Sequence, residues 1–295
     1  MIKLRMAARM YLISSLTLWL STLILLGCSK SEDKAAIPMY VDVEATEVTT
    51  RPTEGSGTHL ITEAWVYADS ILLGAFPIPS RVPLIGEGVV TLDIFAGIRE
   101  NGLAASIGIY PFYNSYQYEV DFEELKIVSI VPVFTYEEGM TIALIEGFEQ
   151  SNIFQLDLDT DPDTKIRISS EGSLDGGSGV AELTSEHPIL EVASDLVPSV
   201  LPSNGAPVYL ELDYKSVIPF SVGTRQHGIA SSPMTIYKLV LFPDDEWQKI
   251  YVNFTEDIRR SNASGYQIVF QSFYDSSISQ EAQTIHLDNI KLLHF

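Results

Sequence analysis

The chain has 295 residues, with 18 Lys and Arg against 39 Asp and Glu, and its formal net charge is -21. This acidity argues against a nucleic-acid partner, because binding to a phosphate backbone depends on clustered Lys and Arg. The sequence contains one Cys, which excludes an internal disulfide bond and a cysteine-based zinc site.

The first 27 residues have the pattern of a signal peptide. A basic start is followed by an apolar run over 11–26, and the run ends in Leu-Leu-Gly-Cys. This ending resembles the lipobox of bacterial lipoprotein precursors. The resemblance implies that a lipoprotein signal peptide, 1–27, is removed and that Cys28 carries a lipid that anchors the chain to a membrane. A plain transmembrane anchor, or a secretory peptide with a chance Cys, is the alternative.

A short polar segment follows the Cys and contains Lys30, Glu32 and Asp33. It resembles the export tag of Bacteroidota-type surface lipoproteins, in which acidic residues close behind the Cys direct the protein to the outer face of the outer membrane. The resemblance implies a cell-surface protein on a flexible tether, 28–36. The alternative is an ordinary polar tether without a sorting role.

The remainder of the chain has the pattern of successive strands. Short runs rich in β-branched and aromatic residues alternate with Gly, Pro, Asn and Asp, which is typical of strands and their turns. No convincing helical periodicity extends over 12 residues without a Gly or Pro. We therefore predict an all-β protein. Because the chain that remains after removal of 1–27 is longer than one sandwich of about 100 residues, we predict two β-sandwich domains, over 37–138 and 142–295.

Each predicted domain resembles a known type of β-domain. Residues 65–76 and the Gly-rich strand over 86–94 resemble the opening of PEGA-like domains, which implies a surface spacer or binding module. A Gly-Phe-Glu start at 147–149, strands over 208–215 and 246–254, and a closing Leu-Asp-Asn-Ile resemble the galactose-binding-like jelly roll of carbohydrate-binding modules. This second resemblance implies a polysaccharide as a partner.

Two groups of acids are candidate calcium ligands. The jelly-roll resemblance implies a structural calcium ion held by Glu149 and Asp288. Separately, Asp residues alternate over 157–163, and carboxylate oxygens are the ligands that calcium prefers. The second segment lacks the Gly and the bidentate Glu of an EF-hand loop, so an acidic surface turn is the alternative there. The five His residues show no spacing that suits a metal site or a catalytic triad.

Aromatic side chains are the best indication of a binding site, because sugar rings stack on exposed aromatic faces. Residues 110–118 contain four Tyr and one Phe. Alternation directs two of the Tyr toward a core and leaves Tyr110 and Tyr113 in a Pro-containing loop, where they are candidate ligand-binding residues. Core packing is the alternative for them as well. Trp65 and Trp247 lie in strand patterns, and we predict that both anchor a core.

The sequence leaves three functions open. The favoured one is a non-enzymatic, lipid-anchored outer-membrane protein that binds a glycan or another ligand. The second is a structural or assembly component that binds another envelope protein. The third is a hydrolase, but no Gly-x-Ser-x-Gly, His-Glu-x-x-His or phosphate-binding loop occurs, and 39 acids do not locate a pair of catalytic carboxylates.

Overall fold

The computed structural model describes residues 36–295, except 199, 229–231 and 262. The predicted signal peptide, nearly all of the tether and the residues predicted for lipidation and export lie outside the described residues: Cys28, Lys30, Glu32 and Asp33. Within the described part, no helix has both the length and the apolar character needed to cross a membrane.

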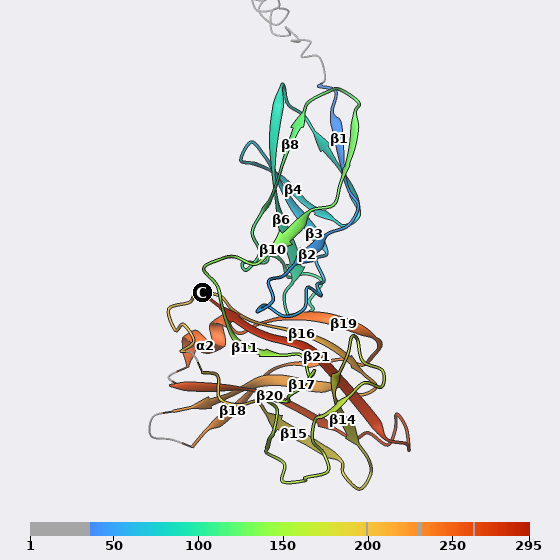
Figure 1. The fold of residues 1–295 in the computed structure, drawn as a ribbon, viewed down its shortest axis with the longest axis vertical. Helices are drawn as coiled ribbons and strands as arrows, with labels where there is room; N and C mark the ends of the chain where they lie inside the picture. The colour runs from blue at the N-terminus through green and yellow to red at the C-terminus, as the bar shows by residue number, and fades with distance from the viewer. Residues whose placement is uncertain (1–35, 199, 229–231, 262) are drawn as a thin grey trace, which may run out of the picture. The chain divides into compact units, whose positions relative to one another are not determined.

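The described chain is all-β, as predicted (Figure 1). We name residues 38–138 the first lobe. Its strands are β1 (Met39–Val43), β2 (Glu47–Thr49), β3 (Glu63–Ala68), β4 (Ile71–Pro77), β5 (Ser80–Leu84), β6 (Val89–Arg99), β7 (Ile107–Ile109), β8 (Tyr116–Asp121), β9 (Ile127–Ile130) and β10 (Val133–Thr135).

We name residues 141–295 the second lobe. Its elements are β11 (Thr141–Glu146), β12 (Leu156–Asp157), β13 (Arg167–Ser169), β14 (Ser178–Leu183), β15 (Ile189–Ala193), β16 (Val208–Ser216), β17 (Phe220–His227), β18 (Met234–Leu241), β19 (Asp244–Asn253), α2 (Thr255–Arg260), β20 (Gly265–Phe273) and β21 (Gln283–His294).

The first lobe places a small sheet over a larger one. Strand β1 pairs with β5 and β9, and its alternating residues Met39, Val41 and Val43 are buried. The larger sheet has the order β4-β3-β6-β7, with β8 also paired to β6. Alternation of apolar and polar residues gives each sheet one apolar face, and the two apolar faces enclose the first hydrophobic core.

The second lobe is a sandwich of two antiparallel sheets (Figure 1). One sheet has the order β13-β14-β21-β16-β19, with β11 also paired to β21. The other has the order β12-β15-β20-β17-β18. Phe148, Phe154, Phe220 and Phe270 are fully buried between the sheets and form the centre of the second core. Strand β18 is an edge strand, and this position matters for the site described below.

Helix α2 was not predicted, because six residues are too few to show helical periodicity. Its first turn contains Glu256 and Asp257 and its last turn contains Arg259 and Arg260, an arrangement that suits the helix dipole. Ile258 is buried in the second core and attaches the helix to the sandwich.

The two cores meet at the outer face of one second-lobe sheet. Tyr209 of β16, Tyr251 of β19 and Leu293 of β21 pack into the first-lobe core. We therefore name the sheet that contains β16, β19 and β21 the covered sheet, and the sheet that contains β15, β17, β18 and β20 the open sheet. Residues 38–295 group by their contacts into one compact unit. The predicted boundaries at 138 and 142 stay a prediction.

Candidate functional site

Tyr110 and Tyr113 do not form an exposed binding surface, so the prediction that they contact a ligand is wrong. Their side chains are 0% and 4% exposed. The Tyr110 ring lies 4.8 Å from the Tyr113 ring and 4.9 Å from that of Tyr251, a residue of the covered sheet. The loop that follows β7 therefore packs its aromatic residues against the second lobe rather than toward solvent.

A buried carboxylate explains why Tyr110, with its hydroxyl, occupies this loop. Glu211 of β16 is 0% exposed and accepts hydrogen bonds from the hydroxyls of Tyr110, at 2.5 Å, and Tyr136, at 2.9 Å. Lys249 lies 3.7 Å from the same carboxylate. A buried charge is costly unless it is paired and hydrogen-bonded, and the first lobe supplies the donors. Burial, followed by the Glu211 charge, raises the pKa of Tyr110.

Lys291 extends this network. Its ammonium group is buried and donates to the Tyr136 hydroxyl at 3.0 Å and to the Ser56 carbonyl oxygen at 2.5 Å. Burial lowers the pKa of Lys291 to about 8. The network joins both lobes through buried polar contacts.

The open sheet has an outer face that the first lobe does not cover. Alternate residues of β17 and β20, such as Val222 and Phe270, point into the second core, so their neighbours point outward. On the outer side Ile189 and Phe273 are exposed. This face is a mixed polar and aromatic surface, which we name the tyrosine face and define by Glu191, Arg225, His227, Tyr237, Gln267 and Gln271.

Tyr237 lies across this face. It belongs to the edge strand β18, and its hydroxyl donates to Oε1 of Glu191 in β15 at 2.8 Å. Strands β17 and β20 lie between β18 and β15, so the Tyr237 and Glu191 side chains reach toward one another above these two strands. Val269 of β20 points outward and is nevertheless 0% exposed, which is consistent with a side chain lying above it. Burial and the bond to Glu191 raise the pKa of Tyr237.

A glycine allows the edge strand to approach the face. The pairing of β17 with β18 shifts register between Val222 and Gly223, where a bulge begins. A Cβ atom at Gly223 would lie 2.2 Å from the Ile236 carbonyl oxygen and 2.7 Å from the Tyr237 Cα atom. The β18 backbone therefore occupies the space above Gly223, and this displacement helps Tyr237 reach across the sheet.

Two basic side chains share one acceptor at the other end of the face. Oε1 of Gln267 accepts from Nη1 of Arg225 at 3.3 Å and from Nε2 of His227 at 2.7 Å. Gln267 is 5% exposed, and its Nε2 donates to the Ser194 carbonyl oxygen at 2.5 Å. This last bond fixes which way the amide points, because only nitrogen can donate to a carbonyl.

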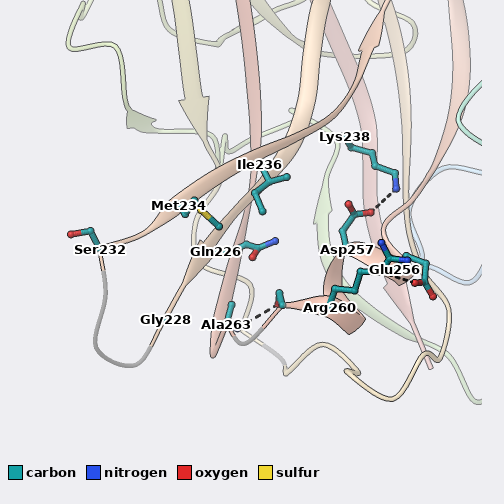
Figure 2. Close-up of a pocket in the computed structure, with 11 residues that line it drawn as sticks. Gln226, Gly228, Ser232, Met234, Ile236, Lys238, Glu256, Asp257, Arg260 and Ala263 are labelled. Atoms are coloured by element: carbon teal, nitrogen blue, oxygen red, sulfur yellow. Dashed lines mark hydrogen bonds and ion pairs between the residues drawn. The ribbon is translucent and has the colours of Figure 1, made fainter.

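A cavity of about 700 Å³ lies on the opposite side of β18 (Figure 2). Met234 and Ile236 contribute an apolar wall, and helix α2 contributes charged residues. Figure 2 shows Lys238 and Asp257 pointing toward one another, with Nζ and Oδ2 2.5 Å apart. Arg260 pairs with Glu256 at 3.2 Å. Because these charges neutralise one another, the cavity has less to offer a polar ligand than the tyrosine face.

The predicted calcium ligands are close enough for their charges to interact. Glu149 follows β11, the first strand of the second lobe, and Asp288 lies in β21, the last. Asp288 is 2% exposed, and its burial raises its pKa to about 7, with added repulsion from the Asp213 and Glu149 carboxylates. Carboxylate oxygens are hard donors, which are the ligands that a calcium ion prefers. The two residues would supply two carboxylates to it, and calcium binding stays a prediction.

The acidic segment over 157–163 forms a turn that binds its own backbone. The Asp159 carboxylate accepts the Asp161 amide at 2.8 Å, and the Asp161 carboxylate accepts the Asp163 amide at 3.0 Å. His187, which no spacing linked to this segment, places Nδ1 2.8 Å from Asp161 Oδ2. That hydrogen bond raises the pKa of His187. These contacts fit the acidic surface turn. They also include His187, whose position beside this turn the sequence did not predict.

The prediction that Trp65 and Trp247 both anchor a core is wrong as well. Trp65 and Trp247 are half-buried and belong to neither hydrophobic core. The Trp247 indole N–H donates to the Gly172 carbonyl oxygen at 3.2 Å, so the residue supports a loop on the outer face of the covered sheet.

The sequence reasoning missed the tyrosine face. A mid-strand Gly at 223 is the one sequence signal that could have indicated the bulge beside Tyr237.

Comparisons with known proteins place carbohydrate-binding modules among the structures that resemble this chain. A family 30 carbohydrate-binding module shares 14% identity and a TM-score of 0.39, over 53% of this chain and 88% of that one. A Clostridium thermocellum family 11 module, in complex with a β-1,3-1,4-mixed-linked tetrasaccharide, shares 13% identity and a TM-score of 0.37, over 50% and 93%. No protein-family model and no curated protein matches the chain.

Proposed function

We propose that this protein is a non-enzymatic, lipid-anchored protein of the cell surface that binds a glycan on the tyrosine face. The observation that carries the proposal is the Tyr237 side chain, which lies along this sheet face and meets Glu191 above the intervening strands. The same face presents the amide of Gln271 and the donors of Arg225, which Gln267 holds in place from below.

The chemistry of a sugar ring suits this arrangement. A pyranose has an apolar face of C–H groups and a rim of hydroxyls that both donate and accept hydrogen bonds. An aromatic ring receives the first, and amide, carboxylate and guanidinium groups receive the second. Tyr237 has little freedom to move because its hydroxyl is bound to Glu191, so a ligand loses little entropy in ordering it.

The proposed location of the protein on the cell surface rests on the first residues of the sequence. Cys28 would carry the lipid, and Lys30, Glu32 and Asp33 would form the export signal. We expect Cys28→Ala to release the protein from the membrane fraction. We expect Glu32→Ala with Asp33→Ala to keep it in that fraction and to protect it from protease on whole cells. Unchanged protease sensitivity would remove the export reading and leave the lipid anchor standing.

A second candidate function is docking onto another envelope protein. The start of β4 exposes Ile71, Leu72 and Leu73, which are 70%, 46% and 36% exposed. Three adjacent exposed aliphatic residues favour a protein surface rather than a sugar. Crosslinking on intact cells, with and without Ile71→Ser, tests this alternative.

Glycan binding is tested with residues 36–295 on a broad polysaccharide array. We expect Tyr237→Ala to weaken binding about tenfold or more, because loss of an aromatic contact costs on the order of 1 kcal/mol or more. Tyr237→Phe keeps the ring and should keep most of the affinity. Tyr67→Ala, a half-buried tyrosine of the first lobe, is the control and should bind like the parent.

Circular dichroism and melting of each variant separate lost binding from lost folding. A folded Tyr237→Ala variant with parental affinity, or a parent that retains no polysaccharide, would overturn glycan binding at this face. Release of reducing ends from a bound polysaccharide would contradict the non-enzymatic part of the proposal.

A further inference from the structure

We propose that the glycan bound at the tyrosine face is acidic, and that Arg225 with His227 recognises a uronic-acid carboxylate. This inference rests on the proposed function and names the ligand class. Its basis is the juxtaposition of an arginine without a carboxylate partner, a histidine and a flat aromatic side chain on one face.

Arg225 differs from every other arginine of the described residues. Each of the others forms an ion pair with a carboxylate of this chain: Arg51 with Glu54, Arg81 with Asp42, Arg99 with Glu63, Arg167 with Asp163, and both Arg259 and Arg260 with Glu256. Arg225 donates to an amide oxygen instead. In a chain with 39 acids, a surface arginine left without one has its charge available for a ligand.

The charge is held in position rather than free to swing. Gln267 is almost completely buried, and its nitrogen is fixed by the Ser194 carbonyl oxygen. Its oxygen therefore points to Arg225 and His227 and holds a guanidinium and an imidazole N–H beside one another. Guanidinium groups bind carboxylates through two parallel hydrogen bonds, and a pre-positioned guanidinium pays less entropy for them.

The acid on this face is distant and occupied. Glu191 pairs with Gln271, which pairs with Ser221, and Arg225 lies four residues farther along β17. At about 3.3 Å per residue this separation is about 13 Å along the strand. The Glu191 carboxylate also accepts the Tyr237 hydroxyl. A glycan that stacks on Tyr237 could therefore present a carboxylate to Arg225 at a distance from the Glu191 carboxylate.

The overall charge makes a local cation necessary for such a ligand. The net charge of -21 repels an acidic polymer at long range, although salt screens that repulsion beyond about 8 Å. A neutral glycan would need no unpaired arginine. The observed pairing pattern, in which one arginine on the same face as Tyr237 has no carboxylate partner, therefore favours a carboxylate-bearing ligand over a neutral one.

The test measures binding of residues 36–295 to polygalacturonate, alginate and hyaluronate, with methyl-esterified polygalacturonate and neutral galactan as uncharged probes and heparin as a sulfated probe. We expect at least one polyuronate to bind about ten- to a hundredfold better than the uncharged probes, because a hydrogen bond to a charged group is stronger than a neutral one. Arg225→Gln should abolish that preference, and Arg225→Lys should restore part of it.

Arg81→Gln is the matched control, because Arg81 is an exposed arginine of the first lobe that pairs with Asp42. It should keep the polyuronate preference. Tyr237-dependent binding of neutral galactan, unaffected by Arg225→Gln, would overturn this inference and leave glycan binding intact. Tighter binding of heparin than of any polyuronate would also overturn the carboxylate assignment. No binding to any probe, by the parent or the variants, would count against the proposed function itself.

Discussion

The hydroxyl of Tyr110 lies 2.5 Å from Oε1 of Glu211, a residue 101 positions away in the sequence. Tyr110 belongs to the first lobe and Glu211 to the covered sheet, and both side chains are 0% exposed. This hydrogen bond and its neighbours replace the water that a carboxylate would otherwise require. The junction between the lobes therefore combines buried hydrogen bonds with the apolar packing of residues such as Leu293.

Tyr110→Phe should destabilise the protein by about 1–3 kcal/mol, because the buried carboxylate loses a donor and the ring is otherwise kept. Urea unfolding measures the change. Tyr118→Phe is the control, since Tyr118 is half-exposed in the first lobe and its loss of a hydroxyl should change stability by less than about 0.5 kcal/mol. Equal midpoints for the parent and Tyr110→Phe would contradict a stabilising role for this bond.

The predictions made from strand alternation agree with the structure. Met39, Val41 and Val43 alternate with polar residues and are buried as that alternation predicts. Tyr110 could not be placed in the same way, because its burial depends on Glu211, and no local pattern shows which distant carboxylate a loop will contact.

The tyrosine face was missed for a related reason. Tyr237 occurs in a run that alternates like any edge strand, and its path across the sheet depends on the register shift opposite Gly223. A shift of register is a property of two paired strands and not of either sequence alone. The chain contains 14 Tyr, so residue type did not single out this one.

Asp288→Asn should stabilise the calcium-free protein at high pH. The folded-state pKa of Asp288 is raised to about 7 from an ordinary 3.8, so the folded protein retains a proton that the unfolded chain releases. The contribution of Asp288 to the free energy of unfolding is therefore complete below its ordinary pKa. It falls as pH rises toward the folded-state pKa. Near pH 8 the Asp288→Asn variant should exceed the parent in free energy of unfolding by on the order of 1–3 kcal/mol. Near pH 4 the two proteins should be equally stable.

Thermal unfolding in chelator at the two pH values measures this difference. Asp175→Asn, an exposed acid beside the same cavity as Glu149, is the control and should show no such pH dependence. Added calcium should raise the melting temperature of the parent and not of Asp288→Asn. A parent that melts identically with calcium and with chelator would contradict the calcium site.

His187→Gln should reduce stability at low pH more than at high pH. The hydrogen bond to Asp161 raises the pKa of His187 above its ordinary 6.5. The charged pair therefore stabilises the fold below the ordinary pKa, and this contribution disappears as pH rises through the folded value. Melting curves of parent and variant at about pH 5.5 and pH 9 test the sign, and NMR titration of His187 measures its pKa directly. A titration midpoint below 6.5 would contradict the prediction.

Gly223→Ala should weaken glycan binding although it removes no recognition group. A methyl group there would meet the Ile236 carbonyl oxygen at 2.2 Å and would push β18 away from the face, taking Tyr237 with it. We also expect a loss of stability of about 1–3 kcal/mol, as for other overpacked sites. Gly139→Ala, where an added Cβ meets nothing within 4 Å, is the matched control. Parental affinity in folded Gly223→Ala would show that the position of Tyr237 does not depend on the glycine.

The first lobe packs on one of the two sheets of the sandwich, so each molecule has a single tyrosine face to present. Under the proposed function, one copy is monovalent and cannot bridge two polysaccharide strands. Tight retention of a long polymer would then come from many anchored copies that engage the same strand, where each added contact acts at a high effective concentration. The surface density of the protein, more than the affinity of one face, would set how firmly a cell holds its glycan.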